Sequence, residues 1–169
     1  MATQMKIDVA APGDIRAVAL AMRDRDVAEF SAISFADTRE ELAVALESRY
    51  EGNPSVMCAR WKDQPACIGG AIETRPGVVS LLFFATDDFP RLALPMTRWL
   101  RNELFPRLLG EGGVHRIEAA ASAAHKDVLS WLYTLGLQPE TGPLAGYGKR
   151  GEPFIMFSKV ADVRSPRAG

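Results

Sequence analysis

Cysteine and histidine are scarce in this sequence. Its 169 residues include two cysteines, Cys58 and Cys67, and two histidines, and none of them has the short spacing of zinc ligands. We therefore expect no metal site built from protein side chains alone. The two cysteines fall on neighbouring predicted strands, and a four-residue turn between the strands would place them diagonally, so we expect buried thiols and no disulfide.

Excess charge and long apolar runs are absent as well. The net charge of −1 gives no reason to expect nonspecific binding to nucleic acid. No apolar run approaches the ~18 to 20 residues of a membrane span. The N-terminal MATQMKIDV lacks the apolar segment of a signal peptide. We therefore expect no nucleic-acid or membrane partner and a cytoplasmic location.

What the sequence does contain is typical of a globular protein. Hydrophobic residues make up 47% and charged residues 24% of the chain. A chain of this length fits one domain with one core, which we place at residues 1–160. The last residues, 161–169, are polar, and we expect a flexible C-terminal tail there.

The apolar periodicity predicts alternating groups of helices and strands. A strand at 5–9 precedes two short helical segments that end near Ile33. A capping-box pattern at Asp37 and Glu40 then predicts the start of a third helix, which ends before Gly52. The remaining elements are expected as follows: strands at 56–61, 66–73 and 78–85 in an antiparallel meander, a long helix at 89–109 that Pro95 starts or kinks, a strand at 114–121, a helix at 125–136, and strands at 144–148 and 154–160.

This order of elements, together with HRIEAAASAAHKDVLSWLYTLGLQPE at residues 115–140, resembles the GNAT family of acyl-CoA-dependent N-acyltransferases. The resemblance covers about residues 5–160. It implies a single α/β (α+β) domain with a central, mostly antiparallel sheet of about seven strands flanked by helices. It also implies that the fourth and fifth strands splay apart.

A narrower resemblance concerns three segments, MRDRDVAE at 22–29, the segment 84–99 and WLYTLG at 131–136. Together these are similar to the GNAT-like proteins that tailed bacteriophages encode, some of which are virion-associated. The resemblance implies a phage-encoded chain in the host cytoplasm or the virion. It also makes phage structural proteins its expected partners.

The family resemblance implies acetyl-CoA or another acyl-CoA as the cofactor. In the family, the end of the fourth strand pairs with the pantetheine arm, and the matching residues here are Phe83, Phe84 and Ala85. The pyrophosphate lies on a Q/R-x-x-G-x-G/A motif, which matches residues 91–96. The residues implied at the phosphate end are Arg91, Met96, Thr97 and Arg98.

The segment FATDDFPRLALPM at 84–96 departs from that motif, because Leu94 and Met96 replace both glycines. Their side chains would meet an approaching phosphate, and Pro95 removes one amide donor. Asp87 and Asp88, if they cap the helix, place carboxylates at its positive end. The pattern therefore predicts that the architecture is kept while cofactor binding is weakened or altered.

Arg91, Arg98 and Arg101 recur with helical spacing along the same segment. They could grip a phosphate from the side, because guanidinium groups bind phosphate oxygens well. A row of charges on a helix is also typical of a solvated face. Both interpretations remain open from the sequence.

Residues for acid–base catalysis are few. The candidates implied by the resemblance are Glu118 on the fifth strand, as the base, and Tyr133, which is adjacent to the position of the family's catalytic tyrosine. Glu73 and His125 are further candidate bases. Asp26 and Glu29, in the charged run at 22–29, border the acceptor side and could contact a substrate or a partner protein. Each of these residues could equally have a structural role.

Two functional hypotheses follow. In the first, the chain transfers an acyl group from acyl-CoA to an amine by direct attack. In the second, it is a non-catalytic, virion-associated structural or interaction protein that retains the fold, because a fold can persist after its site is lost.

Overall fold

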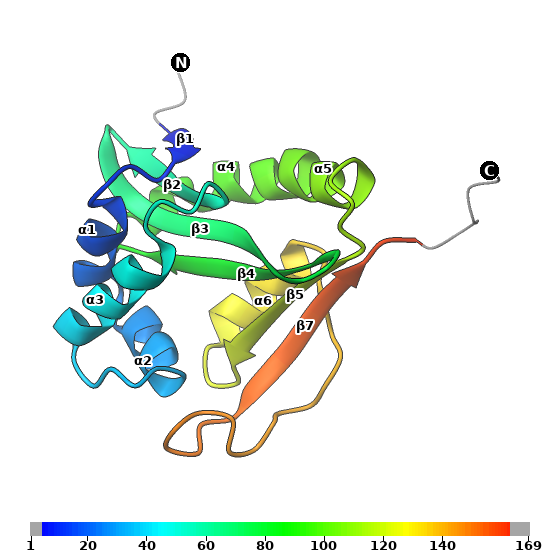
Figure 1. The fold of residues 1–169 in the computed structure, drawn as a ribbon. Coiled ribbons are helices and arrows are strands. Elements are labelled where there is room, and N and C mark those ends of the chain that lie inside the picture. The colour runs from blue at the N-terminus through cyan, green and yellow to red at the C-terminus, as the bar shows by residue number, and fades with distance from the viewer. Residues whose placement is uncertain (1–4, 163–169) are drawn as a thin grey trace.

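The computed structural model describes residues 5–162, which form one seven-stranded sheet with helices on both faces (Figure 1). The strands are β1 (Met5–Val9), β2 (Val56–Trp61), β3 (Gln64–Arg75), β4 (Val78–Ala85), β5 (Arg116–Ser122), β6 (Gln138–Pro139) and β7 (Phe154–Val160). The helices are α1 (Asp14–Leu20), α2 (Asp24–Ala32), α3 (Arg39–Tyr50), α4 (Phe89–Trp99), the π-helical η1 (Leu100–Leu104), α5 (Phe105–Gly110) and α6 (Lys126–Thr134). The part of the expected tail at 163–169 lies outside the described residues.

The sheet has the order β1-β2-β3-β4-β5-β7-β6, and its strands are antiparallel except for β4 and β5. This confirms the predicted fold class. The parallel pair β4–β5 is short, since it joins only residues 78–80 to 116–118. Beyond Ser80 the two strands diverge, which is visible in Figure 1. The predicted splay is therefore present.

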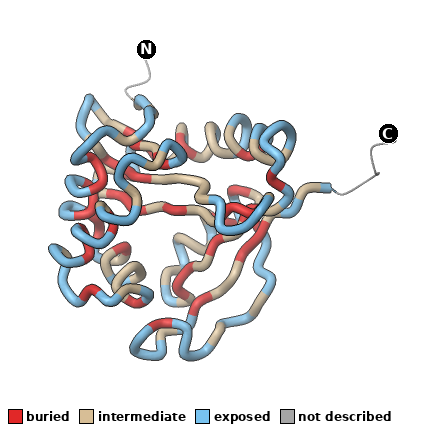
Figure 2. The backbone as a smooth tube through the Cα atoms, viewed as in Figure 1, coloured by how far each residue is buried: buried red, intermediate tan, exposed pale blue. Residues whose placement is uncertain are grey.

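Alternation along the strands divides the core between the two faces of the sheet. On β4, Leu82 and Phe84 pack with α1 and α3, whereas Val79 and Ala85 face α4, α5 and α6. Figure 2 shows the resulting buried stripes along the central strands and the inner sides of the helices. Both faces of β4 are therefore covered, as its continuously apolar sequence predicts.

The predicted long helix is continuous from Phe89 to Gly110, but its middle turn is π-helical. The N–H of Phe105 donates to the C=O of Leu100, five residues back, and Pro106 follows without an N–H of its own. Pro95 lies inside α4 and does not start a helix. Pro95 and Pro106, the two prolines beyond the first turn, explain why the hydrogen-bond ladder of this helix departs from the regular pattern.

Three local predictions were wrong in detail. The N-cap of α3 is Thr38, not Asp37. Its hydroxyl accepts a hydrogen bond from the Glu41 N–H at 3.2 Å, and the Glu41 carboxylate accepts one from the Thr38 N–H. The turn after β2 has two residues, Lys62 and Asp63, both left-handed, so Trp61 pairs with Gln64. Residues 144–148 form no strand, because glycines interrupt them and only Leu144 bridges to β7.

The shorter turn changes the register of the two cysteines. Cys58 pairs with Ile68 and Cys67 with Ala59, so the cysteines remain diagonal. Both are free and buried. Burial raises the pKa of the Cys58 thiol to about 12 and shifts that of Cys67 in the same direction, so neither is a reactive thiolate.

Candidate functional site

The site begins with backbone groups that the splay leaves without a strand partner. The N–H of Thr86 donates to Ala66 on β3 at 2.9 Å, so by alternation the N–H and C=O groups of Phe83 and Ala85 face the gap toward β5. A linear ligand that contains amide groups could form hydrogen bonds with such unpartnered strand groups. The structure therefore brings Phe83 and Ala85 to the gap, as predicted from the family resemblance.

The backbone N–H and C=O of Ala85 are hydrogen-bonded to Asp26 of α2 and to Arg23, the residue that precedes α2. Ala85 N–H donates to Asp26 Oδ2 at 2.9 Å, and Ala85 C=O accepts from Arg23 N–H at 2.9 Å. Asp26 also accepts from Arg23 Nε at 2.9 Å and Nη2 at 3.0 Å. Both side chains are buried, so the end of β4 is closed by a satisfied ion pair of the chain's own.

The same helix contacts the β5 side of the gap. Glu29 Oε2 accepts the N–H of Ser122, at the end of β5, at 2.9 Å and lies 3.2 Å from His125 Nδ1. Arg25 pairs with Asp127 on α6. We call Arg23, Arg25, Asp26 and Glu29 the α2 strap, because together they join the ends of both splayed strands.

The carboxyl of Glu29 is mostly buried where the strap crosses the gap. Its burial raises the pKa of Glu29, although the hydrogen bonds from Ser122 and His125 favour its charged form. A carboxyl with a raised pKa beside a histidine is the kind of group that can accept or hold a proton. It lines the same cavity as Phe83.

An aromatic cluster fills the gap on the α4 and α6 side. Phe83, Phe89 and Trp131 lie in mutual contact, with ring centroids 4.7 to 5.5 Å apart. Trp131 Nε1 donates to Thr97 Oγ1 at 2.8 Å, so α6 is bonded directly to α4. The Arg23 guanidinium covers the cluster, 5.1 Å from the Phe89 centroid. The cluster therefore joins the N-terminal part of α4 to α6 on this side of the splay.

The first turn of α4 has little to offer an anion. Phe89 N–H donates to the C=O of Thr86 and Arg91 N–H to the C=O of Asp88, both at 3.1 Å, while Pro90 has no N–H. The Arg91 guanidinium lies 3.3 Å from the Asp88 carboxylate. Asp88 makes no capping hydrogen bond, contrary to the predicted cap. The amide cradle that a phosphate needs is consumed or missing.

Other residues predicted at the cofactor lie in different surroundings. Leu94 is 60% exposed and Arg98 is exposed, so neither reaches the gap. Met96 is buried with Leu92 and also lines the cavity along the gap. Phe84 packs on the opposite face, against Phe30. Leu94 does not obstruct the phosphate position as expected. The aromatic cluster lies near it instead, and its member Phe89 was not among the predicted site residues.

Glu118 and Tyr133, the predicted catalytic residues, do not meet in the structure. Burial opposes ionisation of Glu118, but hydrogen bonds from Arg116 and Arg75 outweigh it and lower its pKa. Tyr133 is half exposed and packs on Phe157, with ring centroids 5.5 Å apart. A base that is held ionised by two arginines is a weak proton acceptor.

A cavity of about 540 Å³ follows the gap from one face of the sheet to the other. The lining on the α1–α3 face includes Glu29, Phe30 and Tyr147, and the lining on the other face includes Trp99 and Leu104. It is mainly apolar, with Glu29 and Asp26 among its few charged groups. The hollow therefore extends to both faces of the splay, and Phe83 and Trp131 of the aromatic cluster form part of its wall.

Solved structures with similar folds are acetyltransferases. A GNAT-family acetyltransferase from Bacillus anthracis is 12% identical over 95% of this chain and 96% of its own, with a TM-score of 0.68. A ribosomal-protein-S5-alanine acetyltransferase from Vibrio fischeri is 14% identical over 96% of each chain, with a TM-score of 0.65. Spermidine N-acetyltransferase from Vibrio cholerae, solved with CoA and spermine, is 12% identical over 93% of this chain and 95% of its own, with a TM-score of 0.67.

These likenesses establish the fold: the chain has the architecture of the GNAT N-acyltransferases. No protein-family profile matches the sequence, and no curated protein matches it. Among residues 5–162 no helix is long and apolar enough to cross a membrane. The same residues contain no group of three histidine, cysteine or acidic side chains that could hold a metal ion.

Two features of the site differ from what the family resemblance implies for bound acyl-CoA. The pantetheine position is bounded by the Phe83–Phe89–Trp131 cluster, and the Ala85 amide already donates to Asp26. The pyrophosphate position offers no glycine and no available amide in the first three residues of α4. The chain therefore keeps a cavity along the splay, while its own side chains occupy the Ala85 amide and the first turn of α4.

Proposed function

We propose that this chain is a non-catalytic interaction protein that uses the GNAT fold as a scaffold. The observation that carries the proposal is the Asp26 carboxylate, hydrogen-bonded to the Ala85 N–H at the splayed end of β4. A backbone N–H at that place could otherwise stabilise an oxyanion at a reacting carbonyl. Because a buried carboxylate already accepts from it, an oxyanion there would meet repulsion instead of a free donor.

Rearrangement of the strap to admit a ligand would be costly. Asp26 and Arg23 are both buried, and parting such a pair leaves an uncompensated charge worth about 3–5 kcal/mol. The aromatic cluster would also have to separate, and Trp131 would lose its hydrogen bond to Thr97. The binding free energy of an acyl-CoA would have to offset these costs. Its phosphates would also find no available backbone amides in the first turn of α4.

The setting we propose is a phage-infected cell. The support is the sequence resemblance of residues 22–29, 84–99 and 131–136 to the GNAT-like proteins of tailed phages. The residues at 22–29 supply the α2 strap, so the segment that carries this resemblance is also the one that closes the cleft. We propose a location in the host cytoplasm or the virion, with phage structural proteins as partners.

A second candidate function is acyl transfer to an amine, and one observation favours it. Glu29, with a raised pKa, borders a cavity that passes through the splay. As a base it would take the proton of an amine whose nitrogen forms a bond to the thioester carbonyl carbon, while the C–S bond breaks and the leaving thiolate gains a proton. In this alternative Glu29, not Glu118, would act.

Calorimetric titration with acetyl-CoA separates the two functions. The proposal predicts no heat of binding and no thermal shift at millimolar acetyl-CoA. Spermidine N-acetyltransferase is a suitable positive control, since its structure contains CoA. Saturable binding, followed by loss of acyl transfer in Glu29→Gln, would establish the second candidate in place of the first.

A further inference from the structure

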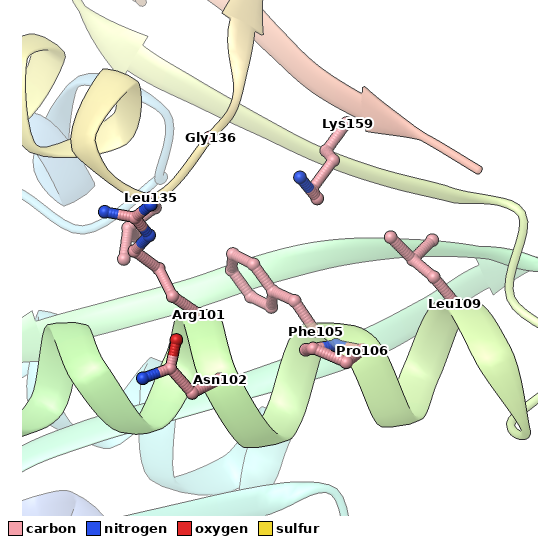
Figure 3. A pocket seen from close by; sticks show the side chains of 8 residues that line it. All are labelled: Arg101, Asn102, Phe105, Pro106, Leu109, Leu135, Gly136 and Lys159. Atoms are coloured by element: carbon pink, nitrogen blue, oxygen red, sulfur yellow. The ribbon is translucent and has the colours of Figure 1, made fainter. Parts of the chain in front are cut away.

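A second hollow lies away from the splayed strands. It has a volume of about 230 Å³ and is enclosed by η1 and α5, the end of α6 and β7 (Figure 3). Its lining residues are Arg101, Asn102, Phe105, Pro106, Leu109, Leu135, Gly136 and Lys159. None of them belongs to the α2 strap or the aromatic cluster, and Leu135 is the one lining residue that this pocket shares with the cavity along the splay.

The pocket contains two positive charges and no negative one. Arg101 and Lys159 are its only charged lining residues. Within residues 5–162 neither forms an ion pair, whereas most arginines of the same part of the chain do. Two cations facing one hollow repel each other unless an anion lies between them.

Lys159 occupies an unusual position for a lysine. Ile155 and Phe157, four and two residues earlier on β7, pack into the core beneath α5 and α6, and by alternation Lys159 continues the same row. Its stem therefore follows the core face, and its ammonium group emerges at the pocket. β7 therefore has a charged side chain at a position where its alternating pattern predicts an apolar one.

The floor between the two cations is apolar. Figure 3 shows Arg101 and Lys159 on opposite sides of the Phe105 ring, with Asn102 beside it. Phe105 and Leu135 are almost fully buried. The nearby C-terminal end of α6 carries only about half a negative charge, which does not balance two cations.

We propose that this pocket binds a small organic anion. The guanidinium of Arg101 and the ammonium of Lys159 hold a carboxylate or phosphate, and the Asn102 amide can donate a further hydrogen bond. The apolar body of the ligand lies on Phe105 and Leu135. The only lining residue that the pocket shares with the cavity along the splay is Leu135, which has no predicted functional role. Anion binding here therefore does not depend on the proposed function.

Titration by ¹H–¹⁵N NMR with sodium benzoate, sodium acetate and inorganic phosphate at low ionic strength tests the proposal. We expect saturable shifts at the Asn102 side-chain amide and the Gly136 backbone amide. Benzoate should bind more tightly than acetate, because its ring adds apolar contact. If phosphate binds more tightly than either, the site is for a phosphate ester.

Three variants assign the contacts. Arg101→Gln and Lys159→Gln should each weaken binding about tenfold, since each removes one charge-assisted hydrogen bond. Arg98→Gln, on the exposed surface of the same helix, should bind as the unaltered chain does. Absence of saturable shifts, or equal weakening in all three variants, would overturn the proposal, because the latter indicates only a diffuse charge effect.

Discussion

The carboxylate of Asp26 accepts hydrogen bonds from two nitrogens of Arg23 and from the amide of Ala85. Each of these donors is buried, and each would be left without a partner if the carboxylate were removed. At the scale of single residues, this group distinguishes a closed strand end from one that is open to a ligand. Its contribution is therefore measurable as stability.

The variant Asp26→Asn should lower the free energy of unfolding by about 3 kcal/mol, because it leaves the buried Arg23 charge uncompensated. Urea unfolding followed by circular dichroism measures the change. The matched control is Asp88→Asn, which removes an exposed ion pair with Arg91 and should cost less than about 1 kcal/mol. Equal effects of the two variants would contradict the account of the strap.

Glu29 gives a second prediction at this scale, through pH. Its pKa is raised in the folded chain, mainly by burial, so the fold binds the proton more tightly than the unfolded chain does. Its contribution to stability is thus full below the ordinary value of 4.5 and is lost as pH rises through the raised pKa.

The variant Glu29→Gln lacks this titration. The stability of Glu29→Gln relative to the unaltered chain should therefore increase as pH rises above 4.5, measured by urea unfolding at several pH values. Because the comparison is a difference, titrating groups that do not interact with Glu29 cancel. A difference that stays constant from pH 4.5 upward would show that burial does not perturb this carboxyl.

At the scale of elements, α2 and α6 close the splay from opposite faces of the sheet. The α2 strap bonds to Ala85 and Ser122, and α6 contributes Trp131, which reaches Thr97 on α4. Pro90, in the first turn of α4, removes an amide donor from the helix end that faces the gap. The helices thus replace, with their own contacts, the pairings that a ligand would otherwise make.

Trp131 tests the contact between α6 and α4. The variant Trp131→Ala should lose about 3 kcal/mol of stability, since it removes the ring from its contacts with Phe83 and Phe89. Trp131→Phe keeps an aromatic ring but loses the hydrogen bond to Thr97, which should cost about 1 kcal/mol. If both variants unfold at the same urea concentration as the unaltered chain, the cluster is not packed as described.

At the scale of the whole molecule, local patterns predicted the order of elements well. The apolar patterns of Val56–Trp61, Val78–Ala85 and Phe154–Val160 placed these strands at their observed bounds. The errors were the N-cap of α3, the turn after β2 and the expected strand at 144–148. The turn Lys62–Asp63 is left-handed without a glycine, and no local signal announced that conformation.

The closed state of the cleft could not be predicted in the same way, because its contacts are distant along the chain. Asp26 and Ala85 are 59 positions apart, and Trp131 and Thr97 are 34 apart. The charged run at 22–29 is equally typical of a solvated helix end. The missing glycines predicted an altered cofactor position, whereas the side chains that pack around it were visible only in the folded chain.

The central claim is that the chain's own side chains close the end of β4 at the splay. The most direct test is a crystal structure of the protein grown with millimolar acetyl-CoA. We expect no cofactor density between β4 and β5, with Trp131 in contact with Phe83 and the Asp26 carboxylate bonded to Ala85. Pantetheine density along Phe83 and Ala85, with a diphosphate on the amides of residues 91–97, would contradict this account.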